Sequence, residues 1–243
     1  MQPTSQPTVI SFIVPAYNEE QLLVATLEAI HSAARNTAVP YEVIVVDDGS
    51  TDQTAALALL QGARVVPVAH RKISATRNAG AAAASGEFFF FVDADTLVNP
   101  QVVQAALAAL RGGAVGGGAA FKFDGTVPWY ARLLLPIVVV LFRLTGIAAG
   151  CFLFCSQSAF VATGGFDESH FCAEEITFSK ALRRYGRFMV LKEWVTTSGR
   201  KLRTFSNREV MVMLLQIARR GPSGIKQRQG MDLWYGQRRI DRK

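Results

Sequence analysis

Two aspartates, Asp93 and Asp95, follow a run of four phenylalanines and a valine. In an extended strand alternate side chains point to the same face, so these carboxylates lie about 6–7 Å apart along the chain. Hard oxygen ligands that face one point suit Mg²⁺ or Mn²⁺, and such an ion would hold a diphosphate. A solvated turn is the alternative interpretation, and the preceding apolar strand favours the metal site.

A second acidic pair, Asp47 and Asp48, ends another apolar, β-branched run and precedes Gly49 and Ser50. One interpretation is an Asx turn that leads into a capped helix. Two adjacent acids exceed what capping requires, so we also expect one of them to accept hydrogen bonds from a base or a ribose. Arg77 is the conspicuous long side chain among small neighbours, although its local sequence is equally consistent with a surface arginine.

A third acidic pair, Glu174 and Glu175, follows a Gly-Gly-Phe-Asp turn and opens a predicted helix. Acids in a first helical turn interact favourably with the helix dipole, which is a purely structural interpretation. The functional interpretation is a general base that removes a proton from an attacking hydroxyl. In that case the charge of one carboxylate raises the pKa of the other.

Strands and helices that alternate along the first half must position these side chains. Strands that are apolar throughout, joined by helices of this length, are typical of a parallel sheet covered on both faces. We therefore predict an α/β fold with a mostly parallel, Rossmann-like sheet flanked by helices, and acidic clusters gathered at the carboxyl ends of the strands. The expected strands are 9–14, 41–46, 64–68 and 88–92, and the expected helices are 18–33, 51–61, 74–84 and one that starts at Asn99 and Pro100.

The second half is less regular, with a glycine-rich stretch at 112–118, an apolar segment at 133–155 and a helix over 174–184. Arg143 interrupts the apolar segment, and a charge in the middle of a spanning helix costs about 2.5–3.5 kcal/mol. We therefore expect a buried or surface-lying helix followed by a strand, rather than a membrane span. We expect one domain over residues 1–200, with a basic helical tail, 201–243, packed on it or extending it.

The composition excludes several classes of protein. Of 243 residues, 50% are hydrophobic and 19% charged, which excludes a disordered or fibrous chain. The net charge of +7 comes from the end of the chain, where residues from 200 onward hold 12 Lys and Arg against 3 Asp and Glu, while the part before holds 14 against 16. No nucleic-acid partner is therefore expected. The few cysteines and the polar N-terminus, which does not fit a signal peptide, predict a cytoplasmic protein.

The ordered motifs resemble the family 2 glycosyltransferases of the GT-A fold, over about residues 8 to 200. The resemblance implies that a sugar passes, with inversion, from a nucleotide-diphosphate donor to a hydroxyl acceptor, with Mn²⁺ or Mg²⁺ as cofactor. The motifs that carry it are Pro15–Glu20, Val45–Asp52, Ala75–Gly80, Asp93–Thr96 and Gly164–Glu168 followed by Glu174 and Glu175.

The resemblance also implies roles for single residues. Asp93 would contact the ribose or the metal, and Asp95 the metal and the pyrophosphate. Glu175 would be the base, although the family usually has Glu-Asp here, and Glu174 remains the alternative. Arg200 and Lys201 lie in a segment similar to one that closes over the diphosphate, with an ordinary basic loop as the alternative. The residues expected to bind the nucleotide are Pro15, Tyr17, Glu19, Asp47, Asp48, Arg77 and Asp93.

The Gln-x-x-Arg-Trp signature of the family's processive synthases is missing, so single-sugar transfer is expected. Two other interpretations stay open. Residues Asp93–Thr96 also fit the DxDxT of haloacid-dehalogenase-type phosphatases, but no Gly-Asp-x-x-x-Asp follows. A GT-A domain that binds a nucleotide or a membrane without catalysis is the second.

A separate hypothesis concerns membranes. Residues 133–142, together with Trp129, Tyr130 and the basic tail, would rest on an anionic bilayer at the inner face of the cell membrane and draw a lipid-linked acceptor from it.

Overall fold

The computed structural model describes residues 9–169, 173–206 and 208–209. Eight strands form one sheet in the order β3-β2-β1-β4-β7-β6-β8-β5. Strands β1 to β4 are parallel, β6 and β8 run in the same direction, and β7 and β5 are antiparallel to their neighbours. The predicted α/β fold with a mostly parallel sheet is confirmed. The strands are β1 Ile10–Ala16, β2 Tyr41–Asp47, β3 Arg64–Pro67, β4 Phe88–Val92, β5 Thr96–Leu97, β6 Ala114–Phe123, β7 Phe152–Ser156 and β8 Arg187–Thr197.

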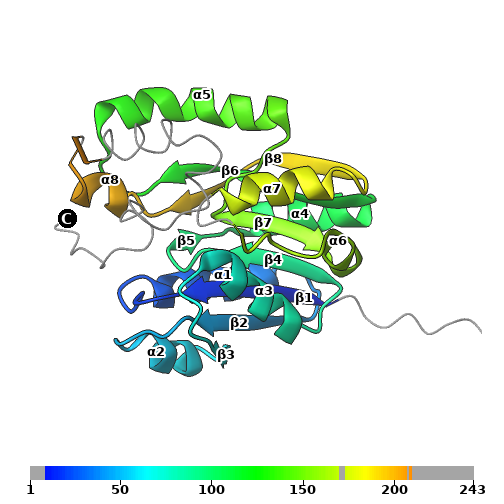
Figure 1. Ribbon diagram of the computed structural model, residues 1–243, viewed down its shortest axis with the longest axis horizontal. Coiled ribbons are helices and arrows are strands. Elements are labelled where there is room, and N and C mark those ends of the chain that lie inside the picture. The colour runs from blue at the N-terminus through cyan, green and yellow to red at the C-terminus, as the bar shows by residue number, and fades with distance from the viewer. Residues whose placement is uncertain (1–8, 170–172, 207, 210–243) are drawn as a thin grey trace, which may run out of the picture.

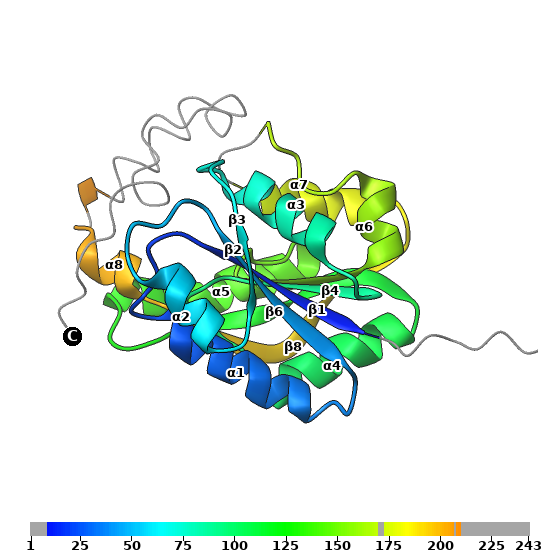
Figure 2. The same ribbon diagram turned by 90° about the horizontal axis from the view of Figure 1, so that it is seen from below.

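Helices cover both faces of the sheet (Figures 1 and 2). Helices α1 and α4 pack on one face, and α3, α6 and α7 pack on the other, each against its own cluster of buried side chains. Helix α5 lies apart, over β6 and β8. The helices are α1 Leu23–Arg35, α2 Thr54–Leu60, α3 Ile73–Ala83, α4 Pro100–Arg111, α5 Trp129–Thr145, α6 Gln157–Thr163, α7 Glu174–Leu182 and α8 Arg200–Thr204.

Strand β4 shows why a continuous apolar run is needed in the middle of this sheet. All five of its residues are buried. Phe90 packs edge-on against Phe12 on the face of α1, with ring centroids 5.3 Å apart, while Phe91 meets Phe166 on the opposite face at 5.0 Å. Since successive side chains point to opposite faces, each face of β4 needs its own phenylalanines.

The glycine-rich stretch forms part of a strand, which the sequence interpretation did not anticipate. Gly116–Gly118 lie in β6 between β7 and β8. A Cβ atom on Gly117 would lie 2.0 Å from the carbonyl oxygen of Met189, and one on Gly118 would lie 2.4 Å from the Cβ of Ala148. Close approach of neighbouring backbone therefore explains glycines where strand propensity disfavours them.

Two helix starts differ from the prediction. Helix α1 begins at Leu23 rather than at Asn18, because the residues after β1 form a loop bonded to the loop after β2. Helix α2 begins at Thr54, its N-cap Gln53 makes no side-chain capping bond, and Asp52 accepts a hydrogen bond from the Thr54 backbone N–H at 2.9 Å. Asp47 closes β2 itself instead of following it.

The long apolar segment forms a helix followed by a strand, as expected. Of the two predicted alternatives, a buried helix and a surface-lying helix, the structure has the surface-lying one. Within α5 only Val139 is buried, and β7 follows after a short connection. In the described part of the chain, no helix has the length and apolar character needed to cross a bilayer. Of the predicted basic tail, α8 is described, and residues 210–243 lie outside the described residues.

Candidate functional site at the carboxyl edge of the sheet

The loops after β1 and β2 are bonded to each other at the edge where these parallel strands end. The Asn18 backbone N–H donates to Ser50 Oγ at 2.9 Å, and the Thr51 N–H donates back to Asn18 Oδ1 at 2.8 Å. The Glu19 N–H donates to Thr54 Oγ1 at 2.8 Å. Asn18 adopts a positive φ of 51°, a conformation that asparagine tolerates better than most residues. The first two sequence motifs therefore form one connected wall.

Asp48 is buried and holds a third loop against that wall. Its carboxylate accepts hydrogen bonds from the Arg71 and Lys72 backbone N–H groups at 2.8 and 3.1 Å, and from Thr76 Oγ1 at 2.9 Å. The Arg71 guanidinium then lies over the ring of Tyr17. Asp48 thus shapes the predicted nucleoside pocket through the loop before α3, a role in addition to the predicted contact with the base or ribose.

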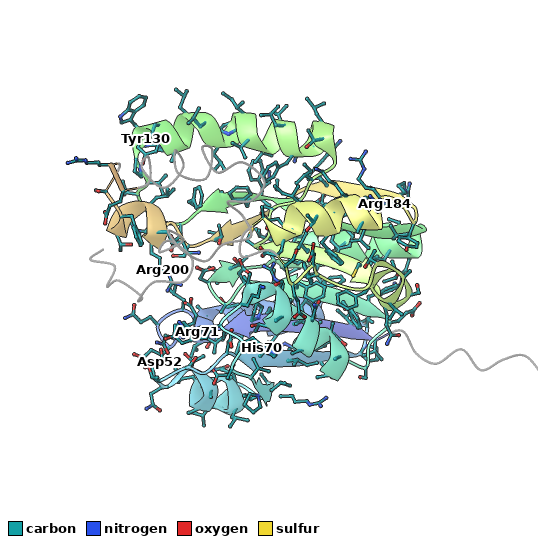
Figure 3. All side chains as sticks on the ribbon, in the orientation of Figure 1. Asp52, His70, Arg71, Tyr130, Arg184 and Arg200 are labelled. Atoms are coloured by element: carbon teal, nitrogen blue, oxygen red, sulfur yellow. The ribbon has the colours of Figure 1, made fainter. Side chains whose placement is uncertain are left out.

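The two metal-ligand candidates lie immediately after β4. The side chain of Asp93 is 29% exposed and that of Asp95 is 13% exposed, so both are partly accessible. The Arg200 Nη2 group donates to Asp95 Oδ2 at 3.3 Å and to Glu19 Oε1 at 2.5 Å. Arg200 therefore joins the start of α8 to two predicted site residues. Figure 3 shows Arg200 and Arg71 on the same side of the molecule, where β1 and β2 end.

Asp93 and Asp95 offer ligands that suit a divalent ion. Two carboxylates are the hard oxygen ligands that Mg²⁺ and Mn²⁺ prefer, and phosphate oxygens and water complete such sites. Among residues 9–169, 173–206 and 208–209, no cluster of three or more His, Cys, Asp or Glu side chains suits a metal. Burial and the neighbouring Asp95 raise the pKa of Asp93, whereas Arg77 and Lys201 lower it. A divalent ion bound here would relieve the repulsion between the two carboxylates.

Arg77 is completely buried and connects the metal candidates to the later acidic pair. Its Nη2 group donates to Asp93 Oδ1 at 2.8 Å and to the Gly150 carbonyl at 2.9 Å, while Nη1 donates to Glu174 Oε1 at 2.7 Å. Burial disfavours the charged guanidinium, but Asp93 and Glu174 outweigh burial and raise the pKa of Arg77. Of the two interpretations of Arg77, the surface arginine is wrong, because this guanidinium balances two carboxylates inside the protein.

Asn78, next to Arg77, fastens the Gly-Gly-Phe-Asp turn to α3. Its amide donates to the Phe166 carbonyl and accepts from the Phe166 N–H, both at 2.9 Å, and also donates to Glu168 Oε1. This paired bonding fixes the turn that leads towards Glu174.

The two glutamates of α7 differ in environment. Glu174 is buried and paired with Arg77, whereas Glu175 is partly buried, with its carboxyl group beside the backbone of Gly150. Burial, and then the charge of Glu174, raise the pKa of Glu175 to about 8. A carboxyl group that titrates near neutral pH is suited to accept a proton, while Glu174 is committed to its ion pair.

The structure brings most of the predicted site residues to one edge of the sheet. Glu19, Asp95 and Arg200 form one linked group, and Asp93, Arg77 and Glu174 form another. Pro15 and Tyr17 are partly buried at the end of β1, and Lys201 is near enough to Asp93 to affect its pKa. The sequence reasoning missed Arg71, Thr76 and Gly150, since their roles depend on contacts with distant segments.

Comparison with known proteins identifies the relatives of this chain. Validoxylamine A glucosyltransferase from Streptomyces hygroscopicus subsp. limoneus is 37% identical over 117 residues, or 45% of this chain and 25% of that protein. Undecaprenyl-phosphate 4-deoxy-4-formamido-L-arabinose transferase from Pseudomonas fluorescens (strain Pf0-1) is 29% identical over 182 residues, or 70% of this chain and 51% of that protein. The chain therefore spans a quarter to a half of the length of these relatives.

Solved structures share the fold at low sequence identity. The mannosyltransferase PcManGT from Pyrobaculum calidifontis, in complex with GDP-Man and Mn²⁺, superposes with a TM-score of 0.66 at 21% identity, covering 92% of this chain and 68% of that chain. TarS 1–349 from S. aureus, in complex with UDP-GlcNAc, gives 0.62 at 21% identity, covering 86% and 66%. These likenesses confirm the predicted GT-A arrangement.

The profile described as glycosyl transferase family 2 matches residues 11–165, which is more than half of the chain and includes the loops and the Asp93–Asp95 motif described above. That match overrules the phosphatase interpretation of the Asp93–Thr96 run. The chain belongs to glycosyl transferase family 2.

Proposed function

We propose that this chain is an inverting, metal-dependent, non-processive glycosyltransferase that moves a sugar from a nucleoside diphosphate donor to a hydroxyl acceptor. The observation that carries the proposal is the bridge from Asp93 through Arg77 to Glu174. Sugar transfer needs groups for the leaving diphosphate and for the incoming hydroxyl close together, since both flank one anomeric carbon. The GDP-Man and UDP-GlcNAc complexes of PcManGT and TarS support a nucleotide-sugar donor.

In the proposed donor complex the nucleoside lies against Pro15 and Tyr17, and the diphosphate faces Asp93 and Asp95. A divalent ion bound by these two carboxylates would neutralise the charge that develops on the leaving diphosphate. Arg200 and Lys201 add positive charge at the same end, and we assign them to the diphosphate. This assignment requires Arg200 to exchange its present contact with Asp95 for one with phosphate.

Glu175 is the proposed base. The acceptor oxygen forms a bond to the anomeric carbon while the bond between that carbon and the diphosphate oxygen breaks, and the diphosphate leaves with the electron pair. The Glu175 carboxylate takes the hydroxyl proton. Attack from the side opposite the leaving group inverts the configuration. Glu174 keeps its ion pair with Arg77, and its charge contributes to the raised pKa of Glu175.

A nucleotide-sugar screen tests the proposal. Thermal shifts with a panel of nucleoside diphosphates, each with and without Mn²⁺, identify the nucleobase that the protein prefers. Donor hydrolysis, measured with a panel of nucleotide sugars, identifies the sugar. Proton NMR of the first product gives its anomeric configuration, and product mass shows whether one sugar or several are added. We expect Glu175→Gln to reduce turnover about 10²–10⁴-fold with little change in nucleotide affinity.

The matched control is Glu28→Gln on α1, which replaces an exposed glutamate and should leave turnover unchanged. Stabilisation by a nucleotide without any transfer would support a binding domain instead of an enzyme. No stabilisation by any nucleoside diphosphate would contradict the proposal, and so would Mg²⁺-dependent aryl phosphate hydrolysis that Asp93→Asn abolishes.

A further inference from the structure

Helix α5 presents an apolar face that the described residues leave uncovered. The outward side chains recur three or four positions apart and are between 51% and 79% exposed, whereas Val139 on the inner side is 3% exposed. Figure 3 shows side chains extending from α5 away from the sheet. Contiguous apolar surface of this kind marks an interaction site. The outward residues are Trp129, Leu133, Leu134, Ile137, Val140, Leu141 and Leu144.

The charges of α5 indicate what covers this face. The helix contains no Asp or Glu and carries two arginines, Arg132 and Arg143. Trp129 and Tyr130 stand at its start, where aromatic rings commonly meet a membrane interface. Arg143 donates to the Leu191 and Lys192 carbonyls of β8, which fixes the helix along the sheet. An apolar face with cations and terminal aromatics is typical of a helix that lies in the plane of a bilayer surface.

A basic cavity opens beside the first turns of α5. It has a volume of about 430 Å³, and its cations are Lys122 at the end of β6 and Arg132 on α5. Leu135 of α5 and residues 125–127 of the loop between β6 and α5 complete the wall of the cavity. Two cations beside apolar side chains suit the phosphate group of a lipid. The lining residues are Lys122, Phe123, Gly125, Thr126, Val127, Arg132 and Leu135.

This cavity adjoins the proposed donor site. The loop that starts at Asp124 accepts a hydrogen bond from the Gly199 N–H at 2.7 Å, and Arg203 bonds to the Asp124 carboxylate at 3.1 Å. Arg200, the residue after Gly199, contacts Asp95. One series of contacts therefore connects the loop that lines the cavity with Asp95, one of the metal-ligand candidates.

We propose that α5 rests on an anionic lipid bilayer through its apolar face, and that Lys122 and Arg132 bind the phosphate of a lipid in that bilayer. This lipid either carries the acceptor hydroxyl or lies beside the molecule that carries it. This part of the proposal rests on the proposed transferase function. Membrane binding itself needs no donor, so the two ideas are tested separately.

Vesicle co-sedimentation of the full chain tests the apolar face. We expect binding to vesicles of phosphatidylcholine mixed with phosphatidylglycerol, weaker binding to phosphatidylcholine alone, and loss of binding in high salt. The variant Leu133→Asp/Leu144→Asp should lose most of the bound fraction. The matched control is Leu60→Asp on α2, because Leu60 is 80% exposed at the other end of the sheet and should bind as the parent does.

Substitution of the cavity cations tests the phosphate site. Lys122→Gln and Arg132→Gln should each lower partitioning onto anionic vesicles about fivefold, with little effect on neutral vesicles. Arg111→Gln, an exposed arginine at the end of α4, is the control and should leave partitioning unchanged. If Arg111→Gln lowered partitioning onto anionic vesicles as much as the cavity variants do, the loss would be explained by overall charge. That result would contradict the proposed phosphate site.

Melting curves and the molecular mass in solution distinguish a bilayer from the two other groups that could cover α5, namely another part of this chain and a second copy of it. If α5 faces a bilayer, Leu133→Asp/Leu144→Asp keeps the melting temperature and the monomer–oligomer distribution of the parent. A large fall in melting temperature would show that the chain covers its own helix, and a change of oligomeric state would show a second copy there. Either result overturns the proposal, as does indifference of the parent protein to anionic vesicles. Nucleoside diphosphate shifts, measured without vesicles, report on the donor site independently.

Discussion

The Nη1 group of Arg77 lies 2.7 Å from Oε1 of Glu174, although the two residues are 97 positions apart in the chain. The same guanidinium binds Asp93 through Nη2. A buried cation thus fixes the distance between the end of β4 and the start of α7. It also distinguishes two adjacent glutamates that the sequence leaves equivalent, since in the described part of the chain Glu174 forms the ion pair with Arg77 and Glu175 does not.

Replacing Arg77 by Met should destabilise the protein by about 3–5 kcal/mol, because the buried Glu174 and the partly buried Asp93 would be left without their counter-ion. Urea unfolding at neutral pH measures the loss. Adding Glu174→Gln to Arg77→Met should restore about 1–3 kcal/mol, since one uncompensated charge is removed. Arg111→Met on the surface of α4 is the control, and an equal effect there would contradict the buried bridge.

The raised pKa of Glu175 predicts how activity varies with pH. A base with a pKa of about 8 is mostly protonated at lower pH, so kcat/KM should fall about tenfold for each pH unit below 8. Glu174→Gln removes the neighbouring charge and should move this limb of the profile towards acid pH. A limb that stays near pH 8 in Glu174→Gln would contradict the assigned roles.

The same pKa predicts a pH dependence of stability. The folded-state pKa of Glu175 lies above its ordinary value of 4.5, so the neutral carboxyl group stabilises the fold below pH 4.5, and this contribution is lost as the pH rises to about 8. Glu175→Gln keeps the side chain neutral throughout. Relative to the parent, this variant should therefore gain stability between pH 5 and pH 9, as measured by urea unfolding at each pH; a constant difference would contradict the shift.

Arg200 is expected to compete with a divalent ion for Asp95. Without nucleotide, Arg200→Ala should strengthen Mn²⁺ binding, because Asp95 loses a cationic partner, while nucleoside diphosphate binding in the presence of Mn²⁺ should weaken about tenfold or more. Calorimetric titrations of metal alone and of nucleotide with metal give the two values. Arg208→Ala, at an exposed position nearby in sequence, should change neither; weaker metal binding in Arg200→Ala would contradict the competition.

Asp48 should matter for stability as well as for the donor. Asp48→Asn replaces an acceptor of three hydrogen bonds by a side chain with donors of its own, and should cost about 2–3 kcal/mol in urea unfolding. Thr76→Val removes only one of these bonds and should cost about 1 kcal/mol. If Asp48→Asn weakened nucleotide binding without changing stability, Asp48 would act on the nucleotide alone.

The sequence was sufficient to predict the first four strands and the common edge of their acidic loops. A buried strand such as β4 can be recognised in the sequence by its continuous run of apolar residues. Loops that follow neighbouring parallel strands lie at the same edge of the sheet. Strand β6, Ala114–Phe123, was not predicted, because its glycines are required by close contacts with the Met189 backbone and with Ala148, which lie far along the chain. The burial of Arg77 was missed for the same reason, since its partners depend on how β7 and α7 return to α3.

The position of β5 has a consequence for how the protein is made. This two-residue strand, which directly follows Asp95, pairs with β8, and the Asp95 carbonyl accepts from the Ser198 N–H. During translation, β8 and Arg200 are synthesised about 100 residues after Asp95, or ~5–20 s later at 5–20 residues per second. The loops after β1 and β2, which form the proposed nucleoside pocket, are therefore synthesised early. The proposed diphosphate site is complete only after β8 and Arg200 have been added. A nascent chain should gain affinity for the nucleoside before it gains affinity for the diphosphate.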